Sequence, residues 1–429
     1  MTLKQLQPLV ATIIAAPVDA GVVKQPIHAL VNALEQESGV SSQADMNTSH
    51  GTYTEHGVAI SPVQAARCSL EPLRTQVFMQ GVAAAINDKV HGDKVVHILY
   101  AGTGPFATLL LPYLACHPEL PVRVTLLDIH QENIEAVKKL VARWHIGHLI
   151  SEYVVADATC WQPGAQSRFD IVISETMTAL LRREPQVWIF KNLVRYLQAQ
   201  GVLIPQVVSL RAWLERAKER VLIDEYFRLD KAAAQRLARD DITDIRGELV
   251  IPAQHQSDDH FTLTTDIQVY NHCVLSEGQS SLTVPFSVPP QATCLFAGAH
   301  VPFHYANPRQ ADFIFDFPHD KRLAAHTLPS INDCADLGLI YIKRAFAQCL
   351  WAKQNQQPRS LSPCDWQGEL FLTQALGIPL DIWFAHLFNA PDLASFESRL
   401  LQCCPALLCP QQVMEMNRQL LAKLHRQNE

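Results

Sequence analysis

The sequence has no long apolar run, no paired-cysteine motif and no excess of basic residues, and each absence excludes a class of protein. No stretch approaches the roughly 18 uninterrupted apolar residues of a membrane-spanning helix, so we expect no membrane partner. Lys and Arg number 35 against 42 Asp and Glu, and the net charge of −7 gives no electrostatic basis for nucleic-acid binding. A negative charge favours a cationic substrate, although a solvated acidic surface explains it equally well.

The 11 cysteines are an odd number at irregular spacing and never form a CxxC pair. Such usage is typical of reduced, mostly buried thiols, so we expect a cytoplasmic protein. The 18 histidines are dispersed and do not pair with cysteines at zinc-ligand spacing, so no metal site is predicted. One Lys precedes a short apolar run at the start, but the amphipathic continuation to Leu34 indicates helices rather than a secretion signal.

A chain of 429 residues exceeds one ordinary hydrophobic core, so several domains are expected. We place N-terminal helices and a linker at 1–60, a Rossmann-like domain at 61–205, a β-rich domain at 206–330 and a helical region at 331–429. Within 61–205, buried strand patterns alternate with helical patterns, which predicts a doubly wound parallel sheet of the α/β class. The short alternating runs of the β-rich domain predict a barrel or sandwich that serves the substrate or a dimer interface.

The patterns also predict individual elements. The expected strands of the Rossmann-like domain are 95–101, 122–128, 151–157, 169–174 and 202–205, and its expected helices are 62–87, 105–114, 133–144 and 188–198. Further helices are expected at 225–240, 337–353, 368–376, 381–388, 392–402 and 411–427. Residues 41–60 are polar and rich in turn formers, which predicts a linker or a lid over a site.

The stretch FDIVISETMTALLRRE, residues 169–184, carries the strongest indication of chemistry. A buried strand delivers Glu175 at its C-terminal end, where open α/β sheets bind ligands. Glu184 follows nine residues later, so two carboxylates can face each other across a cation. A planar guanidinium matches such a pair best, because its N–H groups bond carboxylates in bidentate fashion. The alternative is a strand-end acid and an ordinary Glu at a helix N-terminus.

The loop YAGTGPF, residues 100–106, follows the first predicted strand. Gly102 and Gly104 let the backbone approach a ligand closely, and Pro105 suits the first residue of a helix whose N-terminus faces an anion. The loop is not GxGxxG and lacks the Lys of a P-loop. These differences argue against a pyrophosphate-binding loop and against an NAD-dependent oxidoreductase. Asp128 ends the next strand and is placed to accept hydrogen bonds from ribose hydroxyls, the alternative being a surface turn.

Over about residues 60–215 the chain resembles the class I S-adenosylmethionine-dependent methyltransferases, and more closely their arginine N-methyltransferase branch. The resemblance is carried, in the family's order, by Arg74-Thr75 with Phe78, by ILYAGTGPF, by LLDIH, and by Ser174-Glu175 with Glu184. It implies S-adenosylmethionine as cofactor, with Arg74 on the methionine carboxylate, Tyr100, Gly102 and Gly104 in the glycine loop, Asp128 on the ribose, and Asp157 and Ala158 beside the adenine. Glu175 and Glu184 are then the catalytic residues, and Met177 binds substrate with them.

The sequence also departs from the family's pattern. Thr176 stands where relatives usually have Trp, and Tyr100 replaces the first glycine of the loop. No YFxxY segment lies near the N-terminus and no Thr-His-Trp loop lies in the β-rich domain. The third wall of the substrate pocket is therefore not identified.

Together these residues predict an N-methyltransferase acting on the guanidinium of arginine, with a small-molecule or peptidyl substrate. We slightly favour free L-arginine or a small arginine metabolite over a protein substrate, and we expect a homodimer. The other candidates are a class I methyltransferase acting on another amine or hydroxyl, and a non-catalytic methyltransferase-like scaffold. For Arg74 the alternative is an exposed helix residue that pairs with nearby Glu71.

Overall fold

The structure is a computed structural model. It describes residues 2–44, 51–92, 94–164, 167–216, 219–288, 293, 295–306, 311–317, 373, 378–390, 395, 396, 399, 400 and 402. The chain divides into two compact units, Met1–Pro318 and His319–Glu429. In the second unit, helix α12 (Leu380–Asn389) confirms the helix predicted at 381–388. The helices predicted at 337–353, 368–376, 392–402 and 411–427 lie wholly or mostly outside the described residues.

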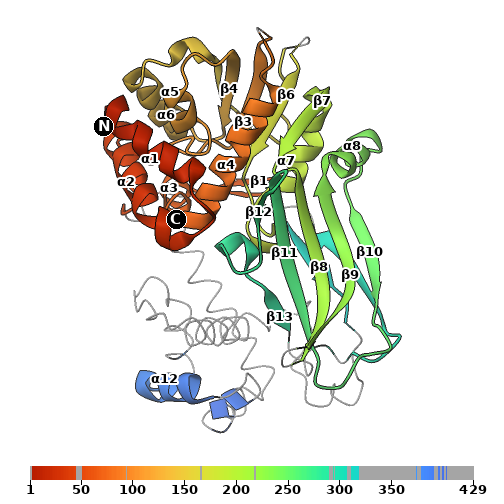
Figure 1. Cartoon of the computed structure of the whole chain (residues 1–429). Helices are drawn as coiled ribbons and strands as arrows, with labels where there is room; N and C mark the ends of the chain where they lie inside the picture. The colour runs from red at the N-terminus through yellow and green to blue at the C-terminus, as the bar shows by residue number, and fades with distance from the viewer. Residues whose placement is uncertain are drawn as a thin grey trace. The chain divides into compact units, whose positions relative to one another are not determined.

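A five-stranded parallel sheet, in the order β5-β4-β3-β6-β7, forms the centre of the first unit (Figure 1). Its strands are β3 (Val96–Ala101), β4 (Val122–Asp128), β5 (Ile150–Val155), β6 (Phe169–Ser174) and β7 (Leu197–Ile204). All four pairings are parallel, and β6 is buried along its whole length, as its uninterrupted apolar pattern predicts. The chain runs outward from β3 through β4 and β5, then crosses to β6 and β7. The strand order therefore reverses between β3 and β6, and sheets of this kind bind ligands at that switch point. The Rossmann-like prediction is confirmed for this sheet.

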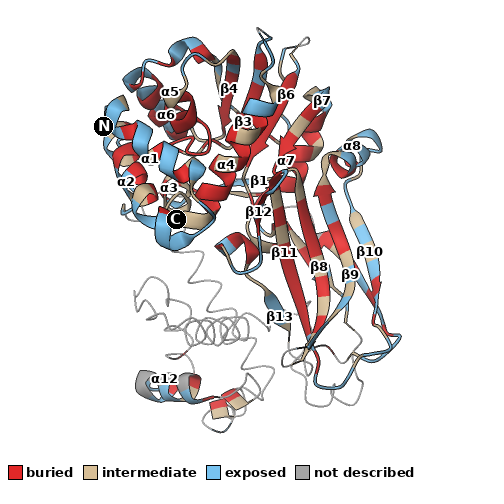
Figure 2. Ribbon diagram, viewed as in Figure 1, coloured by how far each residue is buried: buried red, intermediate tan, exposed pale blue. Residues whose placement is uncertain are grey.

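Helices pack around the parallel sheet. They are α1 (Leu3–Ala15), α2 (Ala20–Ser38), α3 (Pro62–Cys68), α4 (Pro72–Lys89), α5 (Leu111–Cys116), α6 (Gln131–Arg143) and α7 (Gln186–Leu193). The two N-terminal helices were predicted, and their apolar stripes are buried against each other and against α4 (Figure 2). Gln76 and Gln80 of α4 donate hydrogen bonds to the carbonyl of Ala16, at 3.1 and 2.9 Å, which satisfies the C-terminal end of α1.

Two helix predictions near the glycine loop were wrong in their bounds. The single helix expected at 62–87 is broken into α3 and α4, because the residue before Pro72 is disfavoured in helical backbone. The helix expected at 105–114 begins only at Leu111. Gly104 and Ala107 have φ angles of +56° and +43°, so the chain passes through left-handed backbone and Pro105 does not open a helix.

Two later helix predictions were also too long. Helix α7 ends at Leu193 and a 3₁₀ helix, η4 (Val194–Tyr196), continues it to two residues before the predicted end at 198. Gly201 lies inside β7, where the pairing with β6 shifts register. A glycine inside a strand commonly marks such an irregularity. The helix expected at 225–240 starts only at Lys231, as α8 (Lys231–Arg239), because Asp230 ends the preceding strand and caps the helix through a 2.8 Å bond from the Ala233 amide.

Antiparallel strands follow the parallel sheet, as predicted. One sheet contains β8 (Val207–Arg216), β9 (Glu219–Asp230), β11 (His260–Tyr270), β12 (Cys273–Leu275) and β13 (Phe286–Val288), and the other contains β10 (Ile245–Val250), β14 (His300–Ala306) and β15 (Asp312–Phe315). Within the described residues these strands form two open sheets, and a closed barrel is not confirmed. Aromatic rings fill the space between the sheets, with cross-sheet centroid distances of 5.1–5.6 Å for Tyr226, Phe227 and Phe261 against Phe303, Phe313 and Phe315.

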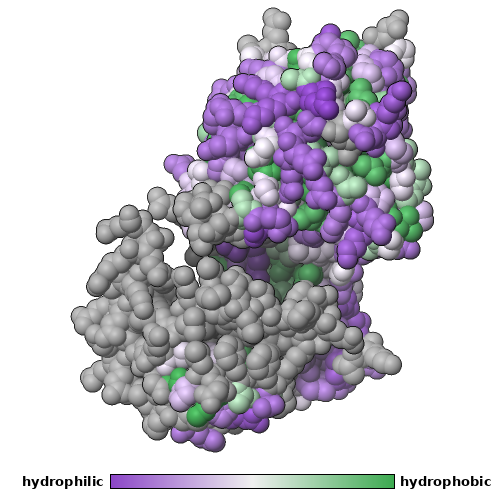
Figure 3. Space-filling model, turned by 90° about the vertical axis from the view of Figure 1, so that its left-hand side faces the viewer, coloured by the Kyte–Doolittle hydropathy of each residue, from purple (hydrophilic) through white to green (hydrophobic). Residues whose placement is uncertain are grey.

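The boundaries drawn at residues 60, 205 and 330 from the sequence stay predictions, since the N-terminal helices, the parallel sheet and the antiparallel sheets all lie in the first compact unit. On the face drawn in Figure 3, hydrophilic side chains predominate over the described upper part, with small apolar areas between them. None of the described helices is both long enough and apolar enough to cross a membrane.

The aromatic layer between the antiparallel sheets generates a stability prediction. Phe313 is 4% exposed and contacts four other rings, so Phe313→Ala should lower the free energy of unfolding by about 3–5 kcal/mol, measured by urea denaturation. The matched control is Phe296→Ala, because Phe296 is 59% exposed and its loss should change stability by no more than about 0.5 kcal/mol. Equal losses for the two variants would contradict the packing described here.

Candidate active site

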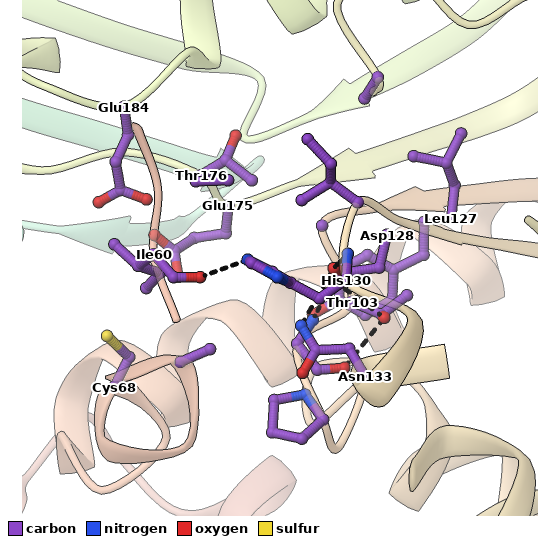
Figure 4. Close-up of a pocket in the computed structure, with 18 of the residues that line it drawn as sticks. Ile60, Cys68, Thr103, Leu127, Asp128, His130, Asn133, Glu175, Thr176 and Glu184 are labelled. Carbon is purple, nitrogen blue, oxygen red and sulfur yellow. Dashed lines mark hydrogen bonds between the residues drawn. The ribbon is translucent and has the colours of Figure 1, made fainter. Parts of the chain in front are cut away.

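A cavity opens at the carboxyl ends of the parallel strands (Figure 4). It gathers, from segments far apart in the sequence, all but one of the site residues predicted from the sequence: Arg74, Tyr100, Gly102, Gly104, Asp128, Asp157, Ala158, Glu175 and Glu184. The exception is Met177, which is 1% exposed, belongs to the hydrophobic core and is not among the lining residues. Its predicted contact with substrate therefore has no support from its position.

Residue 102 in the loop after β3 must be a glycine for two separate reasons. Gly102 has a φ of +75°, and a Cβ atom added there would stand 2.4 Å from Cγ2 of Thr176. Only glycine combines that backbone conformation with so close a neighbour.

Tyr100, which replaces the family's first glycine, is a buried residue of β3, and burial raises the pKa of its phenol far above the usual range. It therefore contributes a neutral wall to the cavity.

Asp128 is the hydrogen-bonding centre of the loop. Its Oδ2 accepts from the Gly104 amide at 2.9 Å, and Thr103 Oγ1, which donates to the Gly104 carbonyl at 3.0 Å, lies 3.4 Å from it. Its Oδ1 accepts from the His130 amide at 2.9 Å and from Asn133 Nδ2 at 3.0 Å. Burial raises the pKa of Asp128, and these bonds oppose that rise. The carboxylate thus ties the glycine loop to the first turn of α6.

The two residues expected beside the adenine lie in the turn after β5. Oδ1 of Asp157 accepts from the amide and the hydroxyl of Thr159 at 2.8 and 2.7 Å. The Ala158 carbonyl accepts from Asn192 Nδ2 of α7 at 3.0 Å. Both residues line the cavity, and these bonds fix the turn that carries them against α7.

Arg74 bonds two acids, Glu175 in the cavity and Glu71 behind it. Its Nε and Nη2 lie 3.1 and 2.6 Å from Oε2 of Glu175, and its Nη1 lies 3.1 Å from Oε1 of Glu71. Glu71 is held in turn by the hydroxyl of Ser280 at 2.8 Å and the amide of Ser281 at 2.9 Å. The side chain of Arg74 is only 7% exposed. The pairing with Glu71 therefore occurs, but the exposed helix residue considered as the alternative does not.

The loop between the two acids has an unusual backbone. Leu180, Leu181 and Arg183 have φ angles of +63°, +55° and +67°, a conformation that costs non-glycine residues of order 1–3 kcal/mol each. Such a loop persists only where surrounding contacts determine it. Gln186 holds the two ends of the loop together, because its Oε1 accepts hydrogen bonds from both the amide and the hydroxyl of Thr176 at 2.9 Å.

The antiparallel sheets supply the contacts that hold this loop. Thr265 Oγ1 accepts from the Leu180 amide at 2.9 Å, and the Tyr305 hydroxyl donates to the Leu181 carbonyl at 2.7 Å. Nε of Arg182 donates to Asp312 at 2.7 Å, and the Arg183 amide bonds to the Ala311 carbonyl. The position of Glu184 is therefore set by strands more than 80 residues further along the chain.

The two acids differ in their partners. Glu175 gives Oε2 to Arg74, while its Oε1 is buried without a hydrogen-bond partner among the described residues. The Glu184 side chain receives no hydrogen bond from the described residues and is 6% exposed. Burial and then the charge of Glu175 raise the pKa of Glu184 to about 8, against the opposing charges of Arg74 and Arg183. Burial also raises the pKa of Glu175, and the charge and hydrogen bonds of Arg74 oppose that rise. One cavity thus contains two carboxyl groups that each have an open oxygen.

A short hairpin, β1 (Thr52–Thr54) with β2 (Gly57–Ala59), closes one side of the cavity. The Val58 amide donates to the Arg183 carbonyl at 2.7 Å, and Nε2 of His130 lies 3.0 Å from the Ile60 carbonyl oxygen. Ile60 lines the cavity, so this part of the stretch predicted as a linker or lid forms a wall of the site. Residues 45–50 of that stretch lie outside the described residues.

Sequence reasoning missed several residues of the site. Glu71, Cys68, His130 and Asn133 line the cavity or support it. The spacing Asp128-x-His130-x-x-Asn133 offered a signal, because an Asn in the first turn of a helix can bond a side chain that precedes the helix. Glu71 offered the weaker signal of an acid three residues before Arg74, which by itself indicates only a surface pair.

Comparison with known proteins gives one domain match and one structural likeness. Residues 100–204 match the model of a methyltransferase domain. No curated protein matches the chain. Among solved structures, the Trypanosoma brucei PRMT1 enzyme–prozyme heterotetrameric complex with AdoHcy is similar at 13% identity, over 54% of this chain and 83% of that chain, with a TM-score of 0.36. A likeness at this TM-score adds no argument about the site.

The matched domain and the parallel sheet define a class I S-adenosylmethionine-dependent methyltransferase domain, with S-adenosylmethionine as its cofactor. The residues present fit this group. Gly102 and Gly104 bring bare backbone to the cavity wall, and among the described residues that wall contains buried polar atoms without hydrogen-bond partners on Glu175 and Asn133. Within the described residues, no group of three or more His, Cys, Asp or Glu side chains could hold a metal ion.

The raised pKa of Glu184 predicts a pH dependence of stability. The folded, substrate-free protein keeps a proton on Glu184 up to about pH 8, whereas the unfolded chain releases it near the ordinary value of 4.5. This contribution to stability is therefore fully present below pH 4.5 and is lost as the pH rises through 8. Glu184→Gln should remove a decline of up to about 1.4 kcal/mol per pH unit, measured by urea unfolding at several pH values.

The matched control for this measurement is Glu152→Gln, an exposed acid on β5. It should keep the wild-type dependence of unfolding free energy on pH. If Glu184→Gln also keeps the wild-type dependence, Glu184 is ionised in the folded protein and the electrostatic account of the pair is wrong.

Proposed function

We propose that the protein is an S-adenosylmethionine-dependent N-methyltransferase whose acceptor is the guanidinium of arginine. One observation carries the proposal: Glu175 and Glu184 line the same cavity as the glycine loop, and each has a carboxyl oxygen that no described residue occupies. Two buried acids without a cation between them are electrostatically unfavourable. A flat cation with several N–H donors satisfies both oxygens at once.

The two acids have unequal roles in this proposal. Arg74 already offsets the charge of Glu175 and fixes its orientation. Glu184 has no such partner, so the entering guanidinium is what favours its ionised form. Binding then draws positive charge onto the nitrogens that touch the carboxylates. The nitrogen that remains is more lone-pair-like and is the nucleophile. A free guanidinium is a poor nucleophile, because it stays protonated far above neutral pH.

When bound, S-adenosylmethionine supplies an electrophilic methyl group on a sulfonium. Arg74 would hold its methionine carboxylate, and the backbone around Gly102 and Gly104 would face its central part. Methyl transfer would form one N–C bond on the acceptor and break one S–C bond, and the methylated guanidinium would then release one proton. Glu184 is the acceptor we assign to that proton. Holding both reactants in line in a cavity without bulk water contributes on the order of 7–11 kcal/mol to lowering the barrier.

We slightly favour free L-arginine or a small arginine metabolite over a protein substrate. The side chains of Arg74 and Glu175 are only 7% and 10% exposed, and Glu184 is 6% exposed. The acceptor must therefore present its cation at the end of a narrow chain, as arginine does. The same demand is met by an arginine residue of a peptide, so both substrates enter the test.

The substrate is tested by mass spectrometry after incubation with S-adenosylmethionine. Free arginine, arginine-containing peptides, lysine and simple amines are offered in parallel. A mass increase of one or two methyl groups on an arginine compound supports the proposal. Methylation of the amines alone would favour the second candidate, a class I enzyme with an incidental pair of acids. Absence of cofactor binding in calorimetry would favour a non-catalytic scaffold.

A variant separates the acceptor side of the site from the cofactor side. Glu184→Gln keeps the shape of the side chain but cannot take the charge, so turnover should fall by at least about 10²-fold. The affinity for S-adenosylhomocysteine, measured by calorimetry, should remain nearly unchanged, because Glu184 is not assigned to the cofactor.

Glu152→Gln is again the matched control, since it removes an exposed acid outside the cavity. It should leave both turnover and cofactor affinity at wild-type values. If Glu184→Gln lost cofactor affinity and turnover to the same extent, the division of roles between the two sides would be refuted.

A further inference from the structure

We infer that the hairpin β1–β2 positions Glu184, and that Gly57 and Val58 are the positioning residues through which it does so. The hairpin lies before the segment that matches a methyltransferase domain, so that match says nothing about it. It meets the loop between the two acids (residues 176–183, the acid loop) through backbone atoms. The inference deepens the proposed function, on which it rests for the role of Glu184 as the acid that meets the acceptor cation.

The turn that leads into Glu184 is strained. Arg183 has a φ of +67°, and the Glu184 amide donates to the Arg182 carbonyl at 2.7 Å, which makes a three-residue turn of the rarer form with positive φ. The amide of Arg183 donates to the Ala311 carbonyl on one side, and its carbonyl accepts from the Val58 amide at 2.7 Å on the other. A strained turn persists only where its surroundings determine it. The direction of the Glu184 side chain therefore depends on Val58 as well as on Ala311.

Gly57 brings the hairpin against the backbone of the second acid. Its φ is +135°, and a Cβ atom added there would lie 2.6 Å from the carbonyl oxygen of Arg183 and 3.3 Å from the carbonyl carbon of Glu184. Both are backbone atoms, so neither can turn aside as the end of a flexible side chain can. Residue 57 must therefore be glycine for the Val58 amide to reach its acceptor.

The hairpin depends on its neighbours for its own position. Its two strands pair over only three residues each, and an isolated hairpin of two strands is marginally stable. Besides the bond to the acid loop, the ring of His56 stacks on that of Trp188 in α7, with centroids 5.2 Å apart and 28° between the planes. Nε2 of His130 lies 3.0 Å from the carbonyl oxygen of Ile60, which follows β2 (Figure 4). The hairpin is therefore fixed at the acid loop, at α7 and at the start of α6, and moving it away from the cavity also releases the turn before Glu184.

The hairpin acts on Glu184 through burial and direction rather than through charge. Glu184 is 6% exposed, and burial is the largest cause of its raised pKa. Among the described residues, the charged and titratable groups that face it are Glu175, Arg74, Arg183 and Cys68, and none of them belongs to the hairpin. Displacing the hairpin therefore admits water to the carboxyl group and lets it turn, while these charges remain.

The test compares the titration of Glu184 in the full-length wild-type protein and in Gly57→Ala. Carboxyl-carbon NMR of glutamate-labelled protein follows the titration, and Glu184→Gln assigns the signal. The wild-type midpoint should lie near pH 8. Gly57→Ala should lower it by at least about one pH unit, because the displaced hairpin exposes the carboxyl group to water. Turnover of the methylated acceptor should fall on the order of 10²-fold, since misplacing a reacting group by about 1 Å has an effect of that size.

The matched control is Gly92→Ala, because Gly92 has a φ of +60° and an added Cβ there would meet no atom within 4 Å. This variant introduces backbone strain without displacing a neighbour, so it should keep the wild-type midpoint and turnover. The inference is overturned if Gly57→Ala keeps the wild-type midpoint or turnover, or if Gly92→Ala loses either. The midpoint is measured without substrate. Failure to methylate any arginine compound would therefore refute the proposed function and leave the test of the hairpin intact.

A second measurement needs no variant and covers the case in which Gly57→Ala fails to fold. Hydrogen exchange of the Val58 amide is followed in the wild-type protein. Because this amide donates to the Arg183 carbonyl, it should exchange at least roughly tenfold more slowly than in an unstructured peptide. Exchange at the unstructured rate would show that the hairpin does not hold the turn before Glu184, and would overturn the inference.

Discussion

The site depends on one buried ion pair, between Arg74 and Glu175. A carboxylate as buried as Glu175 would otherwise take up a proton, because removing charge from water is costly. Arg74 offsets this with two bonds to Oε2, and Glu71 with Ser281 holds the guanidinium from the far side. Removing one partner of such a pair is far more damaging than replacing both, since it leaves an uncompensated buried charge. The pair therefore fixes a negative group at the end of β6 before any ligand arrives.

This arrangement leaves the second acid without a hydrogen-bonded cation among the described residues. Arg74 offers its donors to Glu175 and Glu71, so burial and the charge of Glu175 outweigh the more distant charges of Arg74 and Arg183 and raise the pKa of Glu184 to about 8. Near neutral pH the substrate-free pair thus carries less than its full charge. A cation that enters the cavity supplies the positive charge that balances an ionised Glu184, and a neutral ligand does not. The selectivity that we propose for a guanidinium follows from this need for positive charge. It also follows from the fixed directions in which two carboxylates accept hydrogen bonds.

The sequence predicted what is local and missed what depends on distant contacts. Burial of β6 and the place of Glu175 follow from an uninterrupted apolar strand, and nine of the ten predicted site residues line one cavity. The start of α5 could not be predicted, because left-handed backbone at Ala107 is not visible in a residue type that favours helix. The shape of the loop between the two acids was hidden for another reason. It depends on bonds to Thr265, Tyr305 and Asp312, which lie more than 80 residues further along the chain.

The two sides of the cavity are built in different ways, and this bears on how their specificities arise. The cofactor side, as we propose it, uses the glycine loop, Asp128 and the turn at Asp157 within the segment that matches a methyltransferase domain, together with Arg74, which precedes that segment. The acceptor side uses a strained loop whose shape is imposed by Thr265, Tyr305 and Asp312 of the antiparallel sheets. Substitutions in those sheets can thus move Glu184 without touching the groups that hold the cofactor. A domain match confined to residues 100–204 consequently identifies the methyl donor, whereas the contacts that position Glu184 come from strands beyond the matched segment.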